Sequence, residues 1–402
     1  MIHIHPFKAW RPEPKKVNRI ACVPYDVIDT NEAREMAKDN TDSFLHVIRP
    51  EIDLPEGFDL YADETYRKGA ENLDAFKERG LLVQEDAPSL YIYQLKWHDR
   101  TQTGLFACVS VQDYDNDLIV KHELTRPDKE DDRTRHILTQ QAHAEPVMLT
   151  FRDPGNIGGL MDNITGGDPL YNFTAGDGVE HRVWRVGDTS AFVQAFGDVK
   201  KLYVADGHHR CKSASRAAEA ITKENPGHTG SEEYNFFPAV IFPMDLMNIL
   251  AYNRVIYKAS DSTVRRMFRE LKAVNDAPPR PTRRGHVSVY YDGSWHDIML
   301  PEPKERTPAT TLDVARLQTS ILEPYFSITN PRTDKNISFV GGIRGTDALK
   351  KAVDSGKVSL AFSMHPTSIE ELVDVSDAGM LMPPKSTWFE PKLRSGILIH
   401  TF

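Results

Sequence analysis

The chain has 402 residues, of which 40% are hydrophobic and 27% charged, a composition typical of a folded globular protein with two or three domains. Its 49 basic residues are outnumbered by 58 acidic ones, giving a net charge of −9, which argues against a broad nucleic-acid-binding face. Three scattered cysteines without a CxxC pair indicate neither a disulfide framework nor a structural zinc site. They favour a reducing, cytoplasmic location. We expect no signal peptide and, because no run of about 18 apolar residues occurs, no membrane helix.

The N-terminal part of the chain mixes predicted strands and helices. Asp29 and Thr30 can cap a helix over 31–38, whose first turns carry acidic residues that suit the helix dipole. Apolar spacing over 58–79 predicts a second helix. Strands are predicted at 17–23, 42–48, 89–97 and 104–113.

The middle of the chain contains the most informative pattern. A short strand at 118–120 precedes a densely charged stretch, 121–136, and a strand at 146–151 precedes a Gly- and Asp-rich stretch, 153–178, that predicts a loop. An apolar strand at 201–205, a tight turn at 206–210 and a helix at 211–223 then follow in direct succession, before a buried strand at 236–243.

After residue 250 the pattern changes to that of a separate C-terminal α+β unit. Its predicted elements are helices at 261–273, near 311–322 and near 367–378, a proline-rich linker at 277–282, and strands at 286–291, 294–300 and 396–402. The sequence thus predicts a mixed α/β protein with an N-terminal segment (1–114), a core (115–258) and a C-terminal α+β domain (259–402).

The turn between strand and helix has residues that suit a phosphate-binding site. The first N–H groups of a helix are unpaired and carry a partial positive charge, so a phosphate placed there accepts their hydrogen bonds. Gly207 lets the backbone approach a ligand closely, Arg210 can grip phosphate oxygens in a bidentate fork, and His208 and His209 add donors. Asp206 fits better as a magnesium ligand or as a group that orients a hydroxyl.

A structural interpretation of the same turn is open, in which Asp206 caps the helix and both histidines pack nearby. Two other segments carry a similar choice. Pro24-Tyr-Asp-Val presents Tyr25 and Asp26 as part of a possible substrate pocket, in which Asp26 can hold a substrate amine or magnesium. Alternatively, Asp26 hydrogen-bonds its own turn and Tyr25 packs in the core. Lys385 and Ser386 follow a rigid proline entry and suit a phosphate or carboxylate partner, or a segment that anchors the C-terminus.

Val204-Ala-Asp-Gly-His-His-Arg210 resembles the nucleotide-binding turn of the ParB/sulfiredoxin-like fold, especially its version in free L-serine kinases. Nearly the whole chain also resembles a bacterial and archaeal family labelled as a domain of unknown function. The landmarks of that second resemblance are Pro6-Phe-Lys-Ala with Arg11-Pro12, Pro24-Tyr-Asp-Val-Ile28, Lys121-His-Glu123 with Thr125 and Asp132-Arg133, Ala205–Arg210, and Met382-Pro-Pro-Lys-Ser-Thr387 with Pro391-Lys392.

The resemblance to the serine kinases implies a ParB/sulfiredoxin-like core at 115–258 that binds ATP or ADP with Mg²⁺. Those kinases use a glutamate after an early strand as the base, which implies Glu123, although the separation from Glu123 to Asp206 is longer than in that family. The alternative for Glu123 is that it belongs to a solvated charged loop without a catalytic role. We therefore predict Glu123, Asp206 and His209 as catalytic residues. The predicted phosphate ligands are Gly207, His208, Arg210 and Arg133, although Arg133 can instead pair with acids of its own stretch.

The phosphate-binding turn and the resemblance to these families together imply two functions from different classes. The first is a nucleotide-dependent kinase of a small hydroxyl-bearing metabolite, with free L-serine as the first candidate acceptor. The second is a ParB-like nucleotide-binding regulator that switches with CTP or ATP. The chain has no GxxxxGK[ST], GxGxxG, HExxH or GxSxG motif, so other common nucleotide and hydrolase sites are not indicated.

Overall fold

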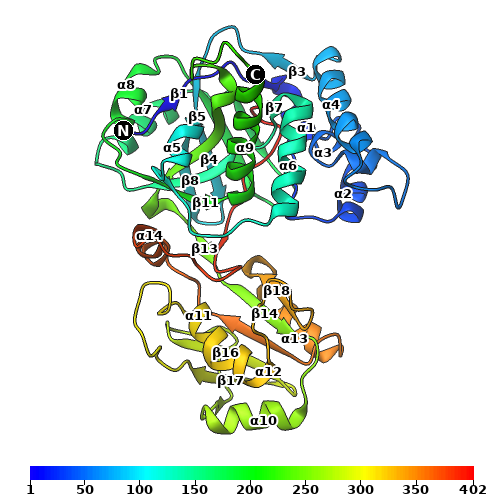
Figure 1. Ribbon diagram of the computed structural model, residues 1–402, viewed down its shortest axis with the longest axis vertical. Coiled ribbons are helices and arrows are strands. Elements are labelled where there is room, and N and C mark those ends of the chain that lie inside the picture. Colours follow the sequence, from blue (N-terminus) through cyan, green and yellow to red (C-terminus); the bar gives the residue numbers. More distant parts are fainter. The chain divides into compact units, whose positions relative to one another are not determined.

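The computed structural model describes residues 1–402, which divide into two compact units (Figure 1). Unit 1 comprises Met1–Lys121, Thr125–Met247 and Pro391–Phe402; unit 2 comprises His122–Leu124 and Asn248–Glu390. Unit 2 is therefore an insertion in unit 1, because the chain leaves unit 1 after Met247 and returns at Pro391. No helix of the chain combines the length and the apolar character needed to cross a membrane.

Unit 1 is built on a nine-stranded sheet with the strand order β6-β11-β8-β12-β5-β4-β10-β9, and β1 pairs with β5. The pairs β6–β11 and β8–β12 are parallel, and the other pairs are antiparallel. Residues from both predicted ranges, 1–114 and 115–258, contribute strands to this one sheet. The strands are β1 (Ile4–His5), β4 (Leu90–Trp97), β5 (Arg100–Ser110), β6 (Ile119–Val120), β8 (Val147–Phe151), β9 (Tyr171–Thr174), β10 (Glu180–Val186), β11 (Leu202–Asp206) and β12 (Phe236–Pro243).

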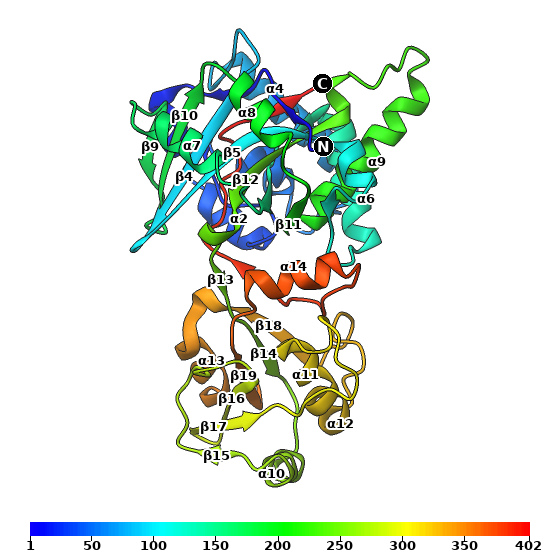
Figure 2. The ribbon, with the colours of Figure 1, turned by 90° about the vertical axis from the view of Figure 1, so that its left-hand side faces the viewer.

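Helices of unit 1 pack on this sheet and on one another. Helix α9 (His208–Glu224) buries a face of small residues, including Cys211, Ala214 and Ala218, against the sheet, and α6 (Pro127–Gln140) packs beside it (Figure 2). The remaining elements are β2 (Trp10–Pro12), η1 (Pro14–Lys16), α1 (Val17–Ile20), α2 (Thr30–Ala37), α3 (Leu45–Ile48), η2 (Pro50–Asp53), α4 (Asp63–Glu78), β3 (Leu82–Gln84), α5 (Val111–Asp115), β7 (Ala142–His143), α7 (Ile157–Thr165), α8 (Ser190–Phe196), η3 (Glu233–Asn235), η4 (Met244–Leu246) and β21 (His400–Thr401).

The C-terminal segment, Pro391–Phe402, packs within unit 1; it is the red end of the chain in Figure 1. Ser395 exchanges two backbone hydrogen bonds with Cys22, Ile399 does the same with Trp10, and β21 pairs with β7. The last residues of the sequence therefore become part of the same fold as the first. The predicted strand at 396–402 is reduced to β21 and the bridge at Ile399.

Unit 2 has a six-stranded antiparallel sheet with the order β15-β17-β16-β19-β14-β18, and a separate pairing of β13 with β20. It has the α+β character expected for the C-terminal part. Its elements are β13 (Ile249–Leu250), β14 (Tyr252–Ile256), α10 (Asp261–Glu270), β15 (Val274–Asn275), β16 (His286–Tyr291), β17 (Ser294–Met299), α11 (Asp313–Leu317), η5 (Gln318–Leu322), α12 (Glu323–Phe326), β18 (Ile337–Gly341), η6 (Gly342–Arg344), α13 (Gly345–Asp354), β19 (Leu360–Met364), α14 (Ile369–Asp377) and β20 (Trp388–Phe389).

Three of the expected elements are wrong. The predicted strand at 17–23 begins as helix α1, and the predicted strand at 42–48 ends as helix α3; each helix has only four residues and buries its apolar side chains. The predicted loop at 153–178 contains α7 and β9, and α7 is anchored by Ile157 and Met161, four residues apart and both buried. The mixed α/β class and the strand–turn–helix succession at 201–223 are confirmed, with the helix starting at His208 instead of residue 211.

Candidate functional site

The turn at Gly207 connects the end of β11 to the start of α9. Gly207 has a φ of +103°, in the left-handed region that favours glycine. A Cβ at this residue would stand 3.0 Å from Arg210 Nε and 3.1 Å from Val147 Cγ1. Both the backbone angle and the lack of space therefore require glycine at this position.

The 17-residue helix α9 begins immediately after this glycine, and no side chain of residue 207 caps it. The first-turn N–H groups of such a helix carry a partial positive charge. With a glycine N-cap, no side-chain oxygen of residue 207 occupies these N–H groups, so they can donate hydrogen bonds to a bound anion. This is the local arrangement that the sequence predicts for a phosphate site.

Arg210 points from the first turn of α9 into unit 1. Its Nη1 donates to the carbonyl oxygen of Pro146, and its Nη2 lies 3.4 Å from Asp206 Oδ2. The side chain is only 8% exposed, and its Nε is buried without a hydrogen-bond partner. Burial opposes the charge, but nearby carboxylates outweigh burial and raise the pKa of Arg210 above its ordinary value.

The position of Pro146 follows from the sheet. Strands β8 and β11 are antiparallel, and their register shifts between Val204 and Asp206, which places the start of β8 beside the end of β11. The carbonyl of Pro146 therefore reaches the guanidinium of Arg210, and this contact fixes the direction of the arginine side chain.

Asp206 lies between two cations. Besides Arg210, the ammonium Nζ of Lys392 is 3.5 Å from Asp206 Oδ2. The lysine side chain is 13% exposed and that of Asp206 27%. The C-terminal segment thus brings a second positive charge to the turn.

Glu145, immediately before Pro146, is a buried carboxylate of the same region. One carboxylate oxygen accepts hydrogen bonds from the backbone N–H of Tyr25 at 3.1 Å and from Ser395 Oγ at 3.0 Å. The other oxygen is 3.8 Å from Arg133 Nη1. Burial raises the pKa of Glu145, and the charges of Arg210 and Arg133 oppose that rise.

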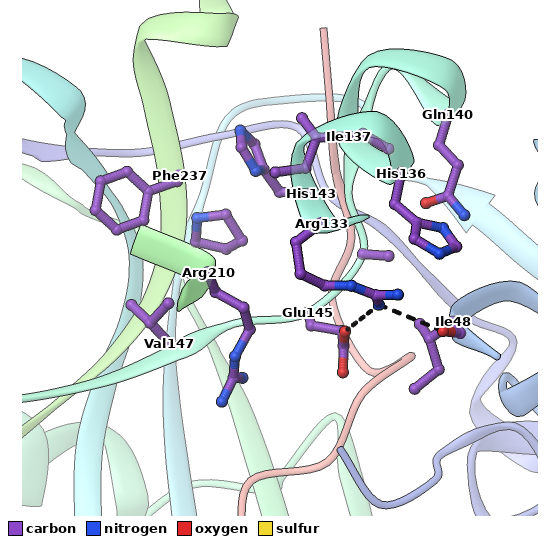
Figure 3. A pocket seen from close by; sticks show the side chains of 13 residues that line it. Ile48, Arg133, His136, Ile137, Gln140, His143, Glu145, Val147, Arg210 and Phe237 are labelled. Carbon is purple, nitrogen blue, oxygen red and sulfur yellow. Dashed lines mark hydrogen bonds and ion pairs between the residues drawn. The ribbon is translucent and has the colours of Figure 1, made fainter. Parts of the chain in front are cut away.

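A small cavity of ≈ 40 Å³ opens between these charged side chains and apolar residues (Figure 3). In Figure 3, Arg133 reaches from α6 toward Glu145 and the carbonyl of Ile48, and Arg210 extends beside Val147. The volume suits a few water molecules and is too small for a nucleotide. The cavity is therefore not large enough to be the nucleotide site, although Arg210 of the turn lines it. Its lining comprises Ile48, Arg133, His136, Ile137, Gln140, Ala142, His143, Ala144, Glu145, Val147, Arg210, Phe237 and Pro238.

Tyr25, Asp26 and Arg133, which the sequence singles out, lie with this network in unit 1. The guanidinium of Arg133 stacks 4.1 Å from the centre of the Tyr25 ring and pairs with Asp132 at 2.8 Å. Asp26 is exposed, and its charge contributes to the raised pKa of Arg210. Arg133 is thus held by an aromatic ring and carboxylates, which is the structural alternative expected for it.

The two histidines of the turn differ in exposure. His208 is buried, and burial lowers its pKa to about 4, so it is neutral at pH 7. His209 is half-buried, and its Nε2 accepts a hydrogen bond from the backbone N–H of Arg126 at 3.1 Å. A neutral His209 with an accepting Nε2 carries its proton on Nδ1.

Glu123, Lys385 and Ser386 belong to unit 2. Ser386 is buried, its hydroxyl donates to the Pro383 carbonyl at 2.6 Å, and its own carbonyl accepts from Thr367. The carbonyl of Lys385, a residue with φ +57°, accepts a hydrogen bond from Arg254. The roles of Glu123 and Lys385 remain predictions, and the contacts of Ser386 are those of an anchoring segment.

Glu145 and Lys392 were not predicted from the sequence as site residues. Lys392 was part of a family landmark, and its burial was not visible from one sequence. Glu145 precedes a predicted strand, but only the antiparallel register of β8 with β11 shows that this end of the strand meets the turn.

No three His, Cys, Asp or Glu side chains of the chain are arranged to hold a metal ion. Magnesium that arrives on a nucleotide needs only one or two protein carboxylates, because phosphate oxygens and water complete its shell. Asp206 fits that smaller requirement, as the carboxylate at the turn.

The protein is thus a mixed α/β protein in which a strand, a glycine N-cap and a helix form the candidate anion site. The model of the family described as "Protein of unknown function (DUF1015)" matches residues 4–319, and the chain belongs to this family. The predicted membership in a family of unknown function is thereby confirmed. No curated protein matches the chain.

Among solved structures, the chain is similar to a conserved hypothetical protein from Pyrococcus furiosus, with 13% identity over 73% of this chain and 95% of that chain and a TM-score of 0.37. A free serine kinase in complex with AMP shows 13% identity over 73% of this chain and 91% of that chain, at a TM-score of 0.38. C-terminally truncated SbnI from Staphylococcus aureus shows 13% identity over 72% and 85%, also at 0.38. Likenesses at these TM-scores do not establish an activity.

Proposed function

We propose that this protein is a nucleotide-dependent phosphotransferase whose nucleotide phosphates bind at the N-terminus of α9, and whose acceptor is a small hydroxyl-bearing metabolite such as free L-serine. The observation that carries the proposal is the glycine N-cap of α9 at φ +103°, with a carboxylate, Asp206, immediately before it. The likeness of Val204–Arg210 to the turn of free serine kinases supports the same assignment.

In this proposal the backbone N–H groups of the first turn of α9 hold phosphate oxygens. We do not propose Arg210 as the bidentate phosphate ligand expected from the sequence, because its Nη1 and Nη2 face Pro146 and Asp206 in the structure. Arg210 is instead a positioning residue that fixes Asp206 and supplies positive charge behind the turn. Phosphoryl transfer depends mainly on such positioning and charge neutralisation.

The reaction transfers one phosphoryl group. The acceptor hydroxyl oxygen forms a bond to the terminal phosphorus, the bond from that phosphorus to the bridging oxygen breaks, and the shortened nucleotide leaves with the electron pair. The hydroxyl proton goes to a carboxylate, for which Asp206 is the candidate in unit 1. Magnesium, when bound with the nucleotide and Asp206, would neutralise charge on the phosphates.

The direct test is product formation. Purified protein is incubated with L-serine, Mg²⁺ and ATP or ADP, and O-phosphoserine is measured by mass spectrometry, with other hydroxyl-bearing amino acids in parallel. Asp206→Asn should lower turnover by roughly 10²- to 10⁴-fold. The matched control is Asp198→Asn, which removes the same charge from an exposed position in unit 1 and should leave turnover unchanged.

Two results would contradict the proposal. One is the absence of product with every acceptor and nucleotide of the panel; the other is full activity of Asp206→Asn. Tight binding of CTP or ATP without product would favour the alternative function, a nucleotide-binding regulator.

A further inference from the structure

Lys392 is placed at the turn by a segment that follows the whole of unit 2 in the sequence. Its Nζ lies 3.5 Å from Asp206 Oδ2, and its side chain is 13% exposed. The neighbouring backbone is fixed, because Ser395 exchanges two hydrogen bonds with Cys22 and donates from its hydroxyl to Glu145. These contacts hold the ammonium group of Lys392 beside Asp206 in unit 1.

An anion at the N-terminus of α9 would lie close to the Asp206 carboxylate, and the repulsion between the two must be offset. Of the two cations at Asp206, Arg210 is held inside the unit by the Pro146 carbonyl. Its one buried N–H without a partner, at Nε, lies 3.0 Å from the position of a Cβ on Gly207. A buried N–H without a partner calls for an acceptor that the protein does not itself supply, such as an anion or a water molecule.

Lysine differs from arginine in having a compact charge on a flexible stem with three donors that can turn. We propose that Lys392 is a phosphate-binding residue: its ammonium moves from Asp206 to the phosphate oxygens when a nucleotide binds, which both compensates the phosphate charge and releases the Asp206 carboxylate. This inference rests on the proposed function, since it names a ligand-binding residue for the same site.

The experiment measures dissociation constants of adenosine, AMP, ADP and ATP by titration calorimetry for wild type, Lys392→Met and Lys392→Gln. A charge-assisted hydrogen bond to phosphate implies roughly ten- to hundred-fold weaker ADP and ATP binding in both variants. Adenosine should bind as in wild type, because it offers Lys392 no phosphate. Lys200→Met removes the same charge from an exposed position and should change none of the four constants.

An equal loss for all four ligands, or no loss for any, overturns the role of Lys392 while leaving nucleotide binding intact. A wild-type protein that binds none of the four overturns the proposed function and this inference together. Lys392→Gln keeps a donor for Asp206, so if Lys392→Met fails to fold, the ratio of the ATP to the adenosine constant in Lys392→Gln decides the question. An unchanged ratio in folded Lys392→Gln overturns the inference.

Discussion

Replacement of Gly207 by alanine tests whether the turn is built as the structure indicates. Two costs arise from the structure. A non-glycine residue at φ +103° is strained by roughly 1–2 kcal/mol. The new Cβ would also stand 3.0–3.2 Å from Arg210 and Val147, and Arg210 cannot move freely while its Nη1 is bound to Pro146. Crowding of that kind costs roughly 1–3 kcal/mol.

Gly230→Ala is the matched control, because Gly230 has φ +92° and a Cβ there would meet nothing within 4 Å. Both variants share the backbone strain and the smaller entropy of the unfolded chain, so their difference isolates the crowding at the turn. We expect Gly207→Ala to lower the free energy of unfolding of unit 1 by roughly 2–5 kcal/mol, and Gly230→Ala by roughly 1–2 kcal/mol.

Urea unfolding followed by tryptophan fluorescence measures both values, since Trp184 is buried in the core of unit 1. Titration with ATP on the same samples shows whether the turn has also lost its ligand. Equal destabilisation by the two substitutions would refute the contact with Arg210 and Val147. Wild-type stability of Gly207→Ala would refute the left-handed glycine itself.

Three further predictions concern buried titratable groups of unit 1. Burial lowers the pKa of His208 from 6.5 to about 4, so as the pH falls this histidine is protonated in the unfolded chain before it is protonated in the folded one. The free energy of unfolding therefore has its full value above pH 6.5 and loses roughly 3 kcal/mol as the pH falls to 4. Urea midpoints against pH should therefore fall less steeply for His208→Asn, and identical slopes would contradict this. Glu145→Gln leaves two buried arginines less compensated and should lower the free energy of unfolding by roughly 3–5 kcal/mol, as measured by thermal unfolding. Glu78→Gln, at an exposed position, should leave the free energy of unfolding almost unchanged. Equal effects of the two substitutions would be evidence against the buried network. The three thiols are buried, and burial raises their pKa, so a thiol-reactive dye should label them only after denaturation, and labelling of the native protein would disprove their burial. They belong to Cys22, Cys108 and Cys211.

The turn at Gly207 could be predicted from the sequence because its signals are local. An apolar strand, a glycine and an alanine-rich helix stand next to one another, and each step is determined by neighbouring residues. The helix start at Asp29, where Asp29 and Glu32 form a capping box for α2, could be predicted for the same reason. Helices α1 and α3 were mistaken for strands because each has only four residues, too few for apolar spacing to separate the two periods.

The inner side of the site could not be predicted, because it depends on contacts distant in the sequence. Glu145 reaches the turn through the register of β8 with β11, which periodicity does not reveal. Lys392 reaches it only because the chain returns to unit 1 after residue 390. Arg210 was expected in the turn before the helix but lies in the first turn of α9, and its direction is determined by the Pro146 carbonyl, 64 residues earlier.

The presence of an acid, Asp206, at the proposed phosphate site is the feature that best constrains the chemistry. A carboxylate beside a phosphate raises the electrostatic energy of the bound state, and a site that only held anions would be improved by its removal. Here Asp206 is instead kept in place by Arg210 and Lys392, both of them largely buried. Because burying such charges is costly, we infer that Asp206 itself is needed, as the proton acceptor or as the ligand of a nucleotide-borne cation. Asp206→Asn separates this from simple anion binding: its turnover with magnesium should be roughly 10²- to 10⁴-fold lower than that of wild type, although it should bind ATP at least as tightly as wild type when no magnesium is added. Weaker ATP binding by Asp206→Asn under those conditions would show that the acid serves only to hold the turn together.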